Sequence, residues 1–382
     1  MQGNYWNRRQ FIGSTVASGL GCALSGVTRC LPGASEEAQA RIPVGVITQS
    51  GGAHLSTYFR SLAAAPEVGS VTVADPSGES FEAARRHLGS KLRATYASSR
   101  TLLRSVRPVM AVISMEAAEA PPAIAAALEA GCHVLTEKPS CLRAEDFEPL
   151  VHKAAEGNRH LMVAFMNRLR PRVRKAREIV QSGEIGKVYA VEAHLVADQT
   201  RLTRASYREQ WFCKRERSGG GHLIWLGIHW LDLMFYITGL AAVEVTGFAG
   251  VVGGQPIDIE DSAAMSMKFS NGAFGTMTSG YYLDTGYHSR IKIWGSGGWL
   301  EMSAVENKPL QWYSTKGDVP KRESLEYPKH PGYAPFVRSC VRASAGLEPA
   351  PISGAEGLRV LRTIFAFYRA VETGQTQKVV TR

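Results

Sequence analysis

The chain has 382 residues, more than one ordinary hydrophobic core accommodates, which predicts two domains. Its hydrophobic content of 45% and charged content of 20% exclude an extended disordered protein. The formal charge of +10 suggests a nucleic-acid partner, but the basic residues are scattered apart from one run, RLRPRVRKAR at 168–177. Such a run is usually the solvated face of a helix. No nucleic-acid-binding motif accompanies it, so we expect no nucleic-acid partner.

Residues 1–40 have the pattern of an export signal. The segment Asn7-Arg8-Arg9-Gln10-Phe11-Ile12 is a twin-arginine pattern, and a weakly apolar run follows it to about Val27. This run is too short and too polar to form a stable membrane span. We predict export by the twin-arginine route to the periplasm or another extracytoplasmic compartment. The alternative is a cytoplasmic tail with a chance Arg-Arg pair.

The six cysteines show no spacing typical of a metal site or a disulfide framework. Two of them, Cys22 and Cys30, lie in the leader. We therefore predict no metal site and no essential disulfide.

Residues 41–165 alternate short β-branched runs with alanine-rich segments of helical periodicity, a pattern typical of a doubly wound parallel sheet. The predicted strands are Pro43–Thr48, Ser70–Ala74, Met110–Ser114, His133–Thr136 and His160–Ala164. The predicted helices are Ala53–Ala65, Ser80–Leu88, Ala120–Ala130 and Ala144–Ala155.

Two features of this domain indicate a dinucleotide. Ser50, Gly51 and Gly52 follow the first strand, where small residues let the backbone approach a pyrophosphate at a helix N-terminus. Asp75 ends the second strand, about where a carboxylate would bind the adenosine ribose. That carboxylate would repel a 2′-phosphate, which favours NAD over NADP. The alternative for Asp75 is a turn-forming Asp-Pro pair.

The stretch Glu137-Lys138-Pro139 follows the strand that ends at Thr136. Proline restricts the residue before it to extended geometry, so Lys138 is expected at the carboxyl end of a strand. In open α/β sheets ligands bind at that end, which makes Lys138 a candidate functional residue. The alternative is a solvated surface Glu-Lys pair.

The sequence pattern changes after residue 165. A basic helix is predicted over Asn167–Ser182, followed by a long strand and a polar connection containing Asp198-Gln199-Thr200-Arg201. Later runs have strand composition, and Asn271-Gly272 between two of them is a strong hairpin signal. These runs are Val243–Val251, Ala263–Phe269, Phe274–Tyr282, Arg290–Trp294 and Trp299–Met302. We expect an α+β domain over 166–352 with a largely antiparallel sheet and little helix, then a closing helix, Gly354–Thr373, within a C-terminal segment 353–382.

The stretch from Gly219 to Asp232 holds a second group of polar candidates. If it is helical, the offsets of three and four residues put the polar and aromatic members on one face. Two imidazoles, an indole and a carboxylate suit a sugar site better than a hydrocarbon core. We expect His222 to be a core histidine and His229 to be functional. The members of this face are His222, Trp225, His229 and Asp232.

Several of these segments resemble the glucose-fructose oxidoreductase/inositol dehydrogenase (Gfo/Idh/MocA) family. They are Thr136-Glu137-Lys138-Pro139, Gly227-Ile228-His229-Trp230-Leu231-Asp232 and Ile259-Glu260-Asp261-Ser262-Ala263. The resemblance implies a Rossmann domain joined to an open-sheet domain. It implies catalytic roles for Lys138 and His229, and Glu137 as the acid that supports the lysine.

The residue patterns and the family resemblance together predict the contacts of the site. The expected cofactor contacts are Ser50, Gly51, Gly52, Asp75, Ser114, Glu137 and Lys138. The expected substrate contacts are Arg168, Trp225, His229 and Asp232.

The chain departs from the family pattern at three places. Its turn has fewer glycines than the family fingerprint. Ser114-Met115-Glu116 puts a carboxylate where the nicotinamide ribose would lie. Trp225 replaces the aspartate usual four residues before the histidine.

The resemblance implies hydride transfer between NAD and a secondary alcohol of a sugar, cyclitol or sugar derivative. One alternative is a glycoside hydrolase acting through a transient keto-sugar, with Asp232 or His288 as the further base. Another is an exported sugar-binding protein without turnover. We expect a small-molecule substrate, and a homodimer or homotetramer formed through the open sheet.

Overall fold

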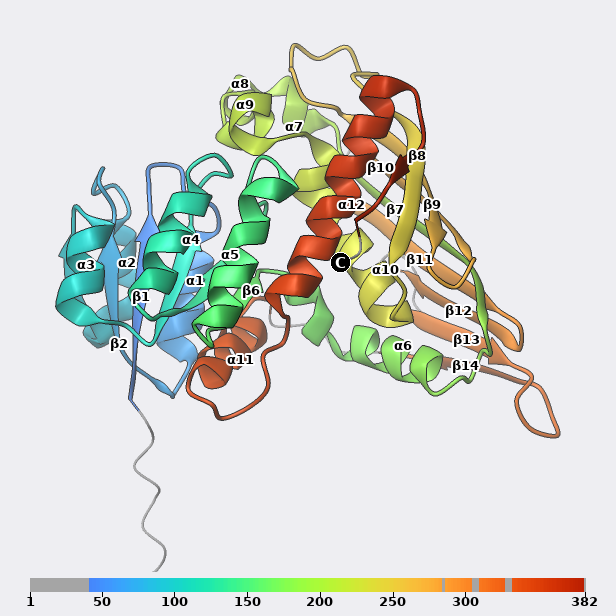
Figure 1. Cartoon of the computed structure of the whole chain (residues 1–382), viewed down its shortest axis with the longest axis horizontal. Helices are drawn as coiled ribbons and strands as arrows, with labels where there is room; N and C mark the ends of the chain where they lie inside the picture. Colours follow the sequence, from blue (N-terminus) through green and yellow to red (C-terminus); the bar gives the residue numbers. More distant parts are fainter. Residues whose placement is uncertain (1–40, 284–285, 304–308, 327–331, 381–382) are drawn as a thin grey trace, which may run out of the picture. The chain divides into compact units, whose positions relative to one another are not determined.

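The computed structural model describes residues 41–283, 286–303, 309–326 and 332–380, and the predicted export signal lies outside them. Within these residues the chain forms a six-stranded sheet and a nine-stranded sheet (Figure 1). No helix among the described residues has both the length and the apolar character needed to cross a membrane.

The six-stranded sheet is parallel throughout, with strand order β3-β2-β1-β4-β5-β6. Its central strands are buried on both faces, as all five residues of β4 are, because helices cover both sides. The prediction of a doubly wound Rossmann sheet is confirmed. The strands are β1 (Ile42–Thr48), β2 (Val68–Ala74), β3 (Leu92–Tyr96), β4 (Met110–Ser114), β5 (His133–Thr136) and β6 (Leu161–Val163).

The sequence patterns missed three elements of this domain, β3, α3 and the short 3₁₀ turn η1. No residue of β3 is fully buried, so it lacks the apolar run that marked the other strands. The helices of the domain are α1 (Leu55–Ala64), α2 (Phe81–Leu88), η1 (Gly89–Lys91), α3 (Ser99–Val106), α4 (Ala120–Glu129) and α5 (Ala144–Glu156).

The nine-stranded sheet has the order β14-β13-β12-β11-β7-β10-β9-β8-β15, and only the β7–β10 pair is parallel. The predicted antiparallel character and the Asn271-Gly272 hairpin between β9 and β10 are both confirmed. The strands are β7 (Val188–Asp198), β8 (Ala242–Gly250), β9 (Ser262–Phe269), β10 (Phe274–Leu283), β11 (Tyr287–Gly295), β12 (Gly298–Ser303), β13 (Leu310–Ser314), β14 (Lys321–Leu325) and β15 (Gln377–Lys378).

Helices pack on one face of this sheet (Figure 1). They are α6 (Pro171–Gln181), α10 (Ile228–Thr238) and α12 (Gly354–Thr373). The predicted closing helix coincides with α12, which starts with a capping box between Ser353 and Glu356. Large side chains remain uncovered on β8 and β10, where Phe248 is 83% and Phe274 66% exposed.

Two expectations about the helices of this domain were wrong. The basic helix is shorter than predicted, because Pro171 holds Arg170 in an extended conformation and separates α6 from the 3₁₀ turn η2 (Met166–Leu169). The domain also contains more helix than expected. The unpredicted helices are α7 (Thr200–Thr203), α8 (Ala205–Arg208), η3 (Trp211–Cys213), α9 (Arg215–Ser218) and α11 (Ala334–Ser344).

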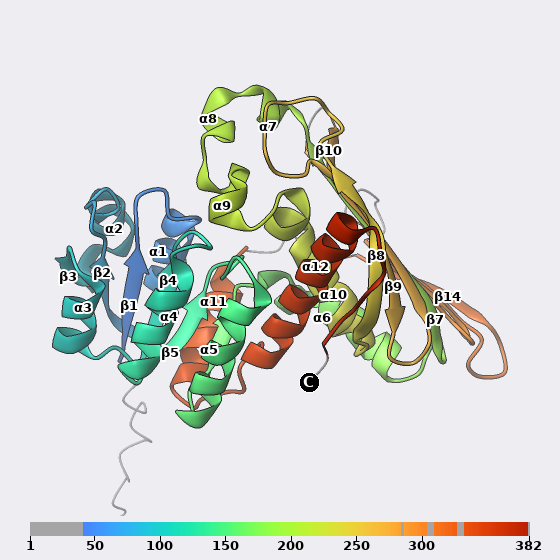
Figure 2. The same cartoon turned by 45° about the horizontal axis from the view of Figure 1, so that its top comes forward.

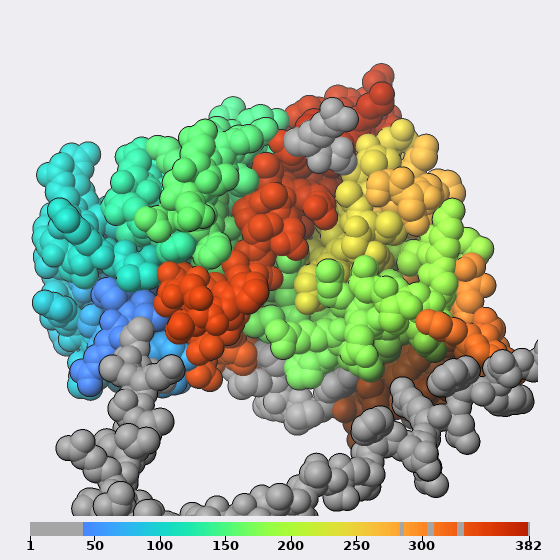
Figure 3. Space-filling view, turned by 60° about the horizontal axis from the view of Figure 1, so that its bottom comes forward, coloured from blue at the N-terminus to red at the C-terminus, as the bar shows by residue number. Residues whose placement is uncertain are grey.

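Helix α11 returns to the Rossmann domain and packs against α1. Glu67, which directly precedes β2, has a buried carboxylate. Arg338 and Arg342 of α11 both donate hydrogen bonds to it, each at 2.8 Å. In Figure 3 an orange-red part of the chain lies beside the blue N-terminal part of the described chain, in agreement with the packing of α11 on α1. The C-terminal part of the chain is therefore joined to both sheets.

Candidate active site

Lys138 lies directly after β5, at the carboxyl edge of the parallel sheet. Its side chain is 1% exposed. The ammonium Nζ donates to the Trp225 carbonyl at 2.7 Å and lies 3.3 Å from the centre of the Trp225 indole. Burial lowers the pKa of Lys138 to about 8, although the neighbouring Glu137 raises it. The amine therefore exchanges protons close to neutral pH, as general acid–base catalysis requires.

Glu137 supports this lysine from inside the Rossmann domain. Its Oε2 accepts a hydrogen bond from the Tyr58 hydroxyl at 2.5 Å and lies 3.4 Å from His54 Nδ1. Its Oε1 lies 4.0 Å from Lys138 Nζ and has no hydrogen-bond partner among the described residues. Burial raises the pKa of Glu137. The combined effect of His54, Lys138 and Tyr58 outweighs this and lowers the pKa to about 2. The carboxylate is therefore ionised and available as the counter-ion of Lys138.

His229 approaches Lys138 from the second domain, on the first turn of α10. Its ring packs edge-on against Phe165, with 6.0 Å between the ring centres. Burial lowers the pKa of His229 to about 3, and the positive charge of Lys138 contributes to this. Its Nδ1 is buried and has no hydrogen-bond partner among the described residues. The imidazole is neutral and has one nitrogen free for a ligand.

Trp225 does not offer the open stacking surface that the sequence suggested. The Phe212 ring stacks on its indole at 4.4 Å between centres and 6° between planes. The Lys138 ammonium lies on the indole as well, which requires the opposite face. Trp225 is 7% exposed as a result. In this arrangement it holds Lys138 through a cation–π contact and its carbonyl.

The expectation that His222, Trp225, His229 and Asp232 share one helical face is also wrong. The π-helical turn η4 (Leu223–Gly227) precedes α10 and changes the angular spacing on which that expectation depended. His222 faces β10 and bonds Ser279 Oγ at 2.7 Å, so it is a core histidine as predicted. Asp232 faces away from Lys138, toward Arg168 of η2.

Arg168 and Asp232 form a buried ion pair, and their contact with the substrate stays a prediction. Arg168 Nη2 donates to Asp232 Oδ1 at 2.6 Å, and Nε donates to both Asp232 oxygens. Arg168 Nη1 donates to Glu356 at 2.6 Å. The side chains of Arg168 and Asp232 are 2% and 1% exposed. The pair joins η2, α10 and α12, and leaves Asp232 no role as a further base.

The glycine turn after β1 has the geometry needed for a pyrophosphate. Gly51 has a positive φ of +72°. A Cβ on Gly52 would lie 2.2 Å from Thr48 Oγ1, so only glycine fits there. Helix α1 then begins without a side-chain cap, with His54 in the left-handed conformation. The uncapped N–H groups of a helix start suit an anion, so these residues fit the diphosphate of NAD.

The other predicted cofactor residues lie around this turn and are hydrogen-bonded within the protein. Ser114 Oγ donates to the Ala53 carbonyl at 2.6 Å, and Ser50 Oγ donates to Glu79 at 2.6 Å. The Asp75 carboxylate accepts bonds from the backbone and hydroxyl of Ser77 and from the backbone of Ser80. Asp75 therefore has the turn-forming role that was the alternative, and its contact with the ribose stays a prediction.

The segment α7–α9 closes over the edge where the cofactor is expected, as Figure 2 shows. The Trp211 indole N–H donates to the Gly51 carbonyl at 3.2 Å. The Arg217 guanidinium pairs with the Glu116 carboxylate, and the Arg217 carbonyl accepts a hydrogen bond from the Ala118 N–H. Glu116, expected near the nicotinamide ribose, therefore already has a counter-ion. Sequence reasoning missed this segment because it has no periodic pattern. The tryptophan in a polar connection was the one available signal.

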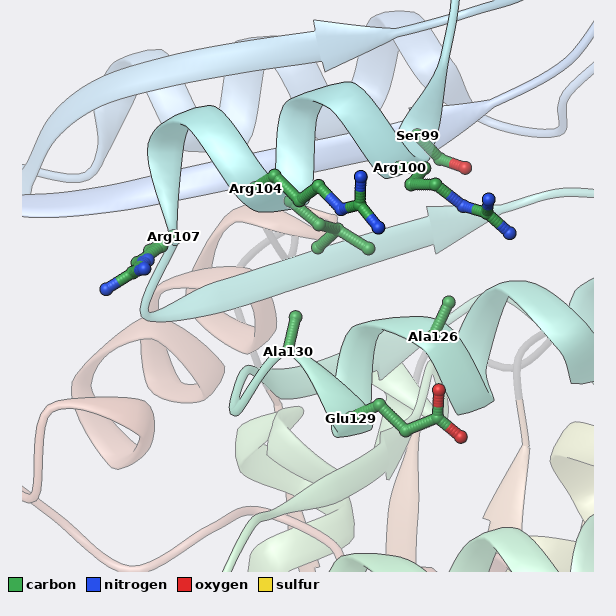
Figure 4. Close-up of a pocket in the computed structure, with 8 residues that line it drawn as sticks. Ser99, Arg100, Arg104, Arg107, Ala126, Glu129 and Ala130 are labelled. Atoms are coloured by element: carbon green, nitrogen blue, oxygen red, sulfur yellow. The ribbon is translucent and has the colours of Figure 1, made fainter.

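A surface cavity of about 660 Å³ lies elsewhere, between α3 and α4. Figure 4 shows Arg100, Arg104 and Arg107 on one side and Glu129 on the other. None of the residues around Lys138 contributes to it, and its arginines are exposed. This cavity is therefore separate from the site around Lys138.

The fold and the site define a two-domain oxidoreductase with an NAD-binding Rossmann domain. Residues 44–165 match the model described as "Oxidoreductase family, NAD-binding Rossmann fold". Residues 173–301 match "GFO/IDH/MocA C-terminal domain". Together these matches span well over half of the sequence. The chain belongs to the Gfo/Idh/MocA family.

Several characterised proteins resemble the chain. D-glucoside 3-dehydrogenase of Escherichia coli (strain K12) is 26% identical over 266 residues, which are 65% of this chain and 73% of that protein. Myo-inositol 2-dehydrogenase of Thermotoga maritima is 23% identical over 262 residues, 67% of this chain and 75% of that protein. The structure of levoglucosan dehydrogenase in complex with NADH and L-sorbose has a TM-score of 0.78 at 19% identity, covering 89% and 100% of the two chains. At this identity the structural likeness shows the fold alone.

Proposed function

We propose that the chain is an NAD-dependent dehydrogenase acting on a secondary alcohol of a sugar or cyclitol. The observation that carries the proposal is Lys138, a buried lysine with a pKa of about 8, beside a neutral His229 at the carboxyl edge of an NAD-binding sheet. The named activities of the glucoside and inositol relatives support the substrate class.

Each site residue has its own role in the proposed reaction. NAD, held at the turn of Gly51 and Gly52, would supply the acceptor for the hydride of the carbinol carbon. Lys138 in its neutral form takes the hydroxyl proton, and its proximity to ionised Glu137 stabilises the ammonium that results. The free nitrogen of His229 orients the hydroxyl by a hydrogen bond. Trp225 fixes the lysine by its carbonyl and its ring face.

The test is a Lys138→Met variant, assayed for NADH formation on a panel of sugars and cyclitols. We expect turnover to fall by about 10²- to 10⁴-fold, the usual contribution of a general acid or base. NADH affinity, followed by fluorescence titration, is expected to persist. Lys153→Met is the matched control, because Lys153 pairs with Glu129 on the surface. Unchanged turnover in Lys138→Met, or a wild-type protein that binds no NADH, would refute the proposal.

We also propose that the protein is exported and that it forms a homodimer or homotetramer. The twin-arginine pattern at Arg8-Arg9 supports export, and the exposed Phe248 and Phe274 support association through the open sheet. Replacing both leader arginines by lysine should abolish export in a fractionation assay. Light scattering of the purified protein measures the oligomer, and a monomer at micromolar concentration would exclude association.

The hydrolase alternative gains no support from the geometry. Asp232, one proposed further base, is fully engaged by Arg168. His288 is exposed on β11 and interacts with His194, on the face of the sheet that carries Arg290. Neither residue joins Lys138 and His229.

A further inference from the structure

Two arginines stand at the carboxyl edge of the parallel sheet, next to the Lys138 site. Strand β6 neighbours β5 in the sheet, and the chain leaves β6 through η2 to Arg170, Pro171 and Arg172 (Figure 1). Lys138 follows β5 in the same way. Adjacent parallel strands end at the same edge, so the two arginines and the lysine flank one region.

Arg170 is close to the catalytic histidine. It is among the charged groups that lower the pKa of His229, together with Lys138. Its backbone is fixed, because its carbonyl accepts from Val173 and Arg174 in the first turn of α6. The guanidinium is therefore presented by a rigid helix start beside His229.

Neither arginine has the partner that a partly buried cation normally has. The Nε atoms of Arg170 and Arg172 are buried and lack hydrogen-bond partners among the described residues. Within the described residues, no carboxylate raises the pKa of either group. The nearby carboxylates, Asp232 and Glu356, are both taken by Arg168.

Leaving these buried Nε atoms without hydrogen-bond partners in the described part of the chain has a cost in stability. Removing a cation from water without a hydrogen-bonding partner is unfavourable, and the two like charges repel each other. Burial and the charge of Arg170 lower the pKa of Arg172 to about 10, so it still carries its charge at neutral pH. Asn167 Oδ1 and His229 Nδ1 are likewise buried without partners in the described part of the chain. Open polar atoms gathered in one region point to a ligand that completes them.

We propose that the substrate carries an oxyanion, a carboxylate or a phosphate, which Arg170 and Arg172 bind while Lys138 and His229 act on its secondary alcohol. The guanidinium fork matches both anions, and charge-assisted hydrogen bonds to it are among the strongest in proteins. This inference rests on the proposed dehydrogenase function and narrows its substrate class from sugars and cyclitols in general to those that carry an acidic group.

The experiment compares D-glucose, D-glucuronate and D-glucose 6-phosphate as substrates of the full-length protein with NAD. We expect wild-type kcat/KM to be higher for one of the two acidic sugars than for glucose. In Arg170→Gln and Arg172→Gln the ratio of acidic to neutral kcat/KM should fall by about 10- to 100-fold, mainly through KM. Whether glucuronate or glucose 6-phosphate shows the larger drop identifies the anion as carboxylate or phosphate. Arg174→Gln, an exposed arginine on the same helix, is the matched control and should keep the wild-type ratio.

Calorimetric titration of each sugar into the NADH-loaded protein gives a readout that does not depend on turnover. Binding of an acidic sugar that weakens in both arginine variants supports the inference even where the oxidised carbon lies elsewhere in the true substrate. Equal ratios in wild type and variants, or no preference for either acidic sugar in binding and in turnover, would overturn it. A drop in NADH affinity in the variants would overturn it too, by assigning the arginines to the cofactor. Failure of the dehydrogenase proposal would give a different result. NADH binding itself would be missing, or Lys138→Met would be fully active.

Discussion

Arg168 and Arg170, which are separated by Leu169, have opposite surroundings. Arg168 is buried behind the site and donates to Asp232 and Glu356 with all three of its nitrogens. Arg170 borders the site, and its buried Nε has no hydrogen-bond partner among the described residues. Arg168 lies within the 3₁₀ turn η2, whereas Arg170 follows that turn in an extended conformation, directly before Pro171.

The contrast distinguishes residues that stabilise the fold from residues whose polar atoms are available to a ligand. The cluster of Arg168, Asp232 and Glu356 is complete in itself and ties three elements together. The groups around Lys138 are incomplete, since Glu137 Oε1 and His229 Nδ1 have no partners in the described chain. Buried polar groups are normally satisfied, so the incomplete ones are the better guide to function.

The strongest test of the first region is an Asp232→Ala variant. It leaves the Arg168 guanidinium buried beside a single remaining carboxylate, Glu356, which is 36% exposed. Breaking a buried ion pair from one side costs about 3–5 kcal/mol, so the free energy of unfolding in urea should drop by that amount. Asp146→Asn, which breaks the exposed pair with Arg143, is the control and should cost about 0–1 kcal/mol. Similar losses in both variants would contradict the assigned structural role.

Much of the fold could be predicted from the sequence, because periodic apolar patterns report which face of an element is buried. The five strands marked by apolar runs and the helix Gly354–Thr373 lie where those patterns put them. Strand β3 and the segment α7–α9 lack such patterns, since tertiary contacts rather than local periodicity define them.

The candidate site was predictable only in part. The order Glu137-Lys138-Pro139 after a strand was enough to place Lys138 at the ligand edge. The direction of Asp232 was not, because one π-helical turn, η4, changes the helical phase and a period of 3.6 residues cannot anticipate it. The pairing of Arg168 with Asp232 spans 64 positions and leaves no local signal.

The second region should respond to substitution in the opposite sense. Arg170→Met keeps an unbranched apolar stem and removes a partly buried charge whose Nε has no hydrogen-bond partner among the described residues. We expect the free energy of unfolding to rise by about 1–2 kcal/mol, because the desolvation cost disappears. Arg174→Met on the exposed side of α6 should stay within about 0.5 kcal/mol of the wild type. A clear loss of stability in Arg170→Met would show that Arg170 has a structural partner and would break the comparison.

The covering segment adds a third test, on the cofactor side of the site. Trp211→Ala removes both the hydrogen bond to Gly51 and the packing against Trp225, at 5.3 Å between ring centres. We expect NADH affinity to fall by about 10-fold, and Trp211→Phe to lose about 3-fold, because the ring remains. The control is Trp299→Ala, in which the lost indole packs on Lys292 of the open sheet. Unchanged affinity in Trp211→Ala would remove the segment from the cofactor site.

The smallest expected effect concerns the proton on Lys138. Glu137 raises the pKa of Lys138 against the larger lowering by burial, which together put it at about 8. Glu137→Gln removes the raising charge, so the pKa of Lys138 should fall and its neutral form should persist to lower pH. The rising limb of kcat/KM against pH, which reports the free enzyme, is expected to move by roughly 1 pH unit toward acid.

This shift distinguishes the two groups that face the substrate. The pKa of His229 is about 3, so its titration would produce a limb far below neutral pH. A limb near pH 8 that moves in Glu137→Gln therefore identifies Lys138 as the base, whereas a limb that stays in place rejects it. Glu129→Gln controls for the loss of one negative charge, because Glu129 pairs with Lys153 on the surface. The outcome decides whether the incomplete hydrogen-bonding around Glu137 serves to set the proton affinity of Lys138.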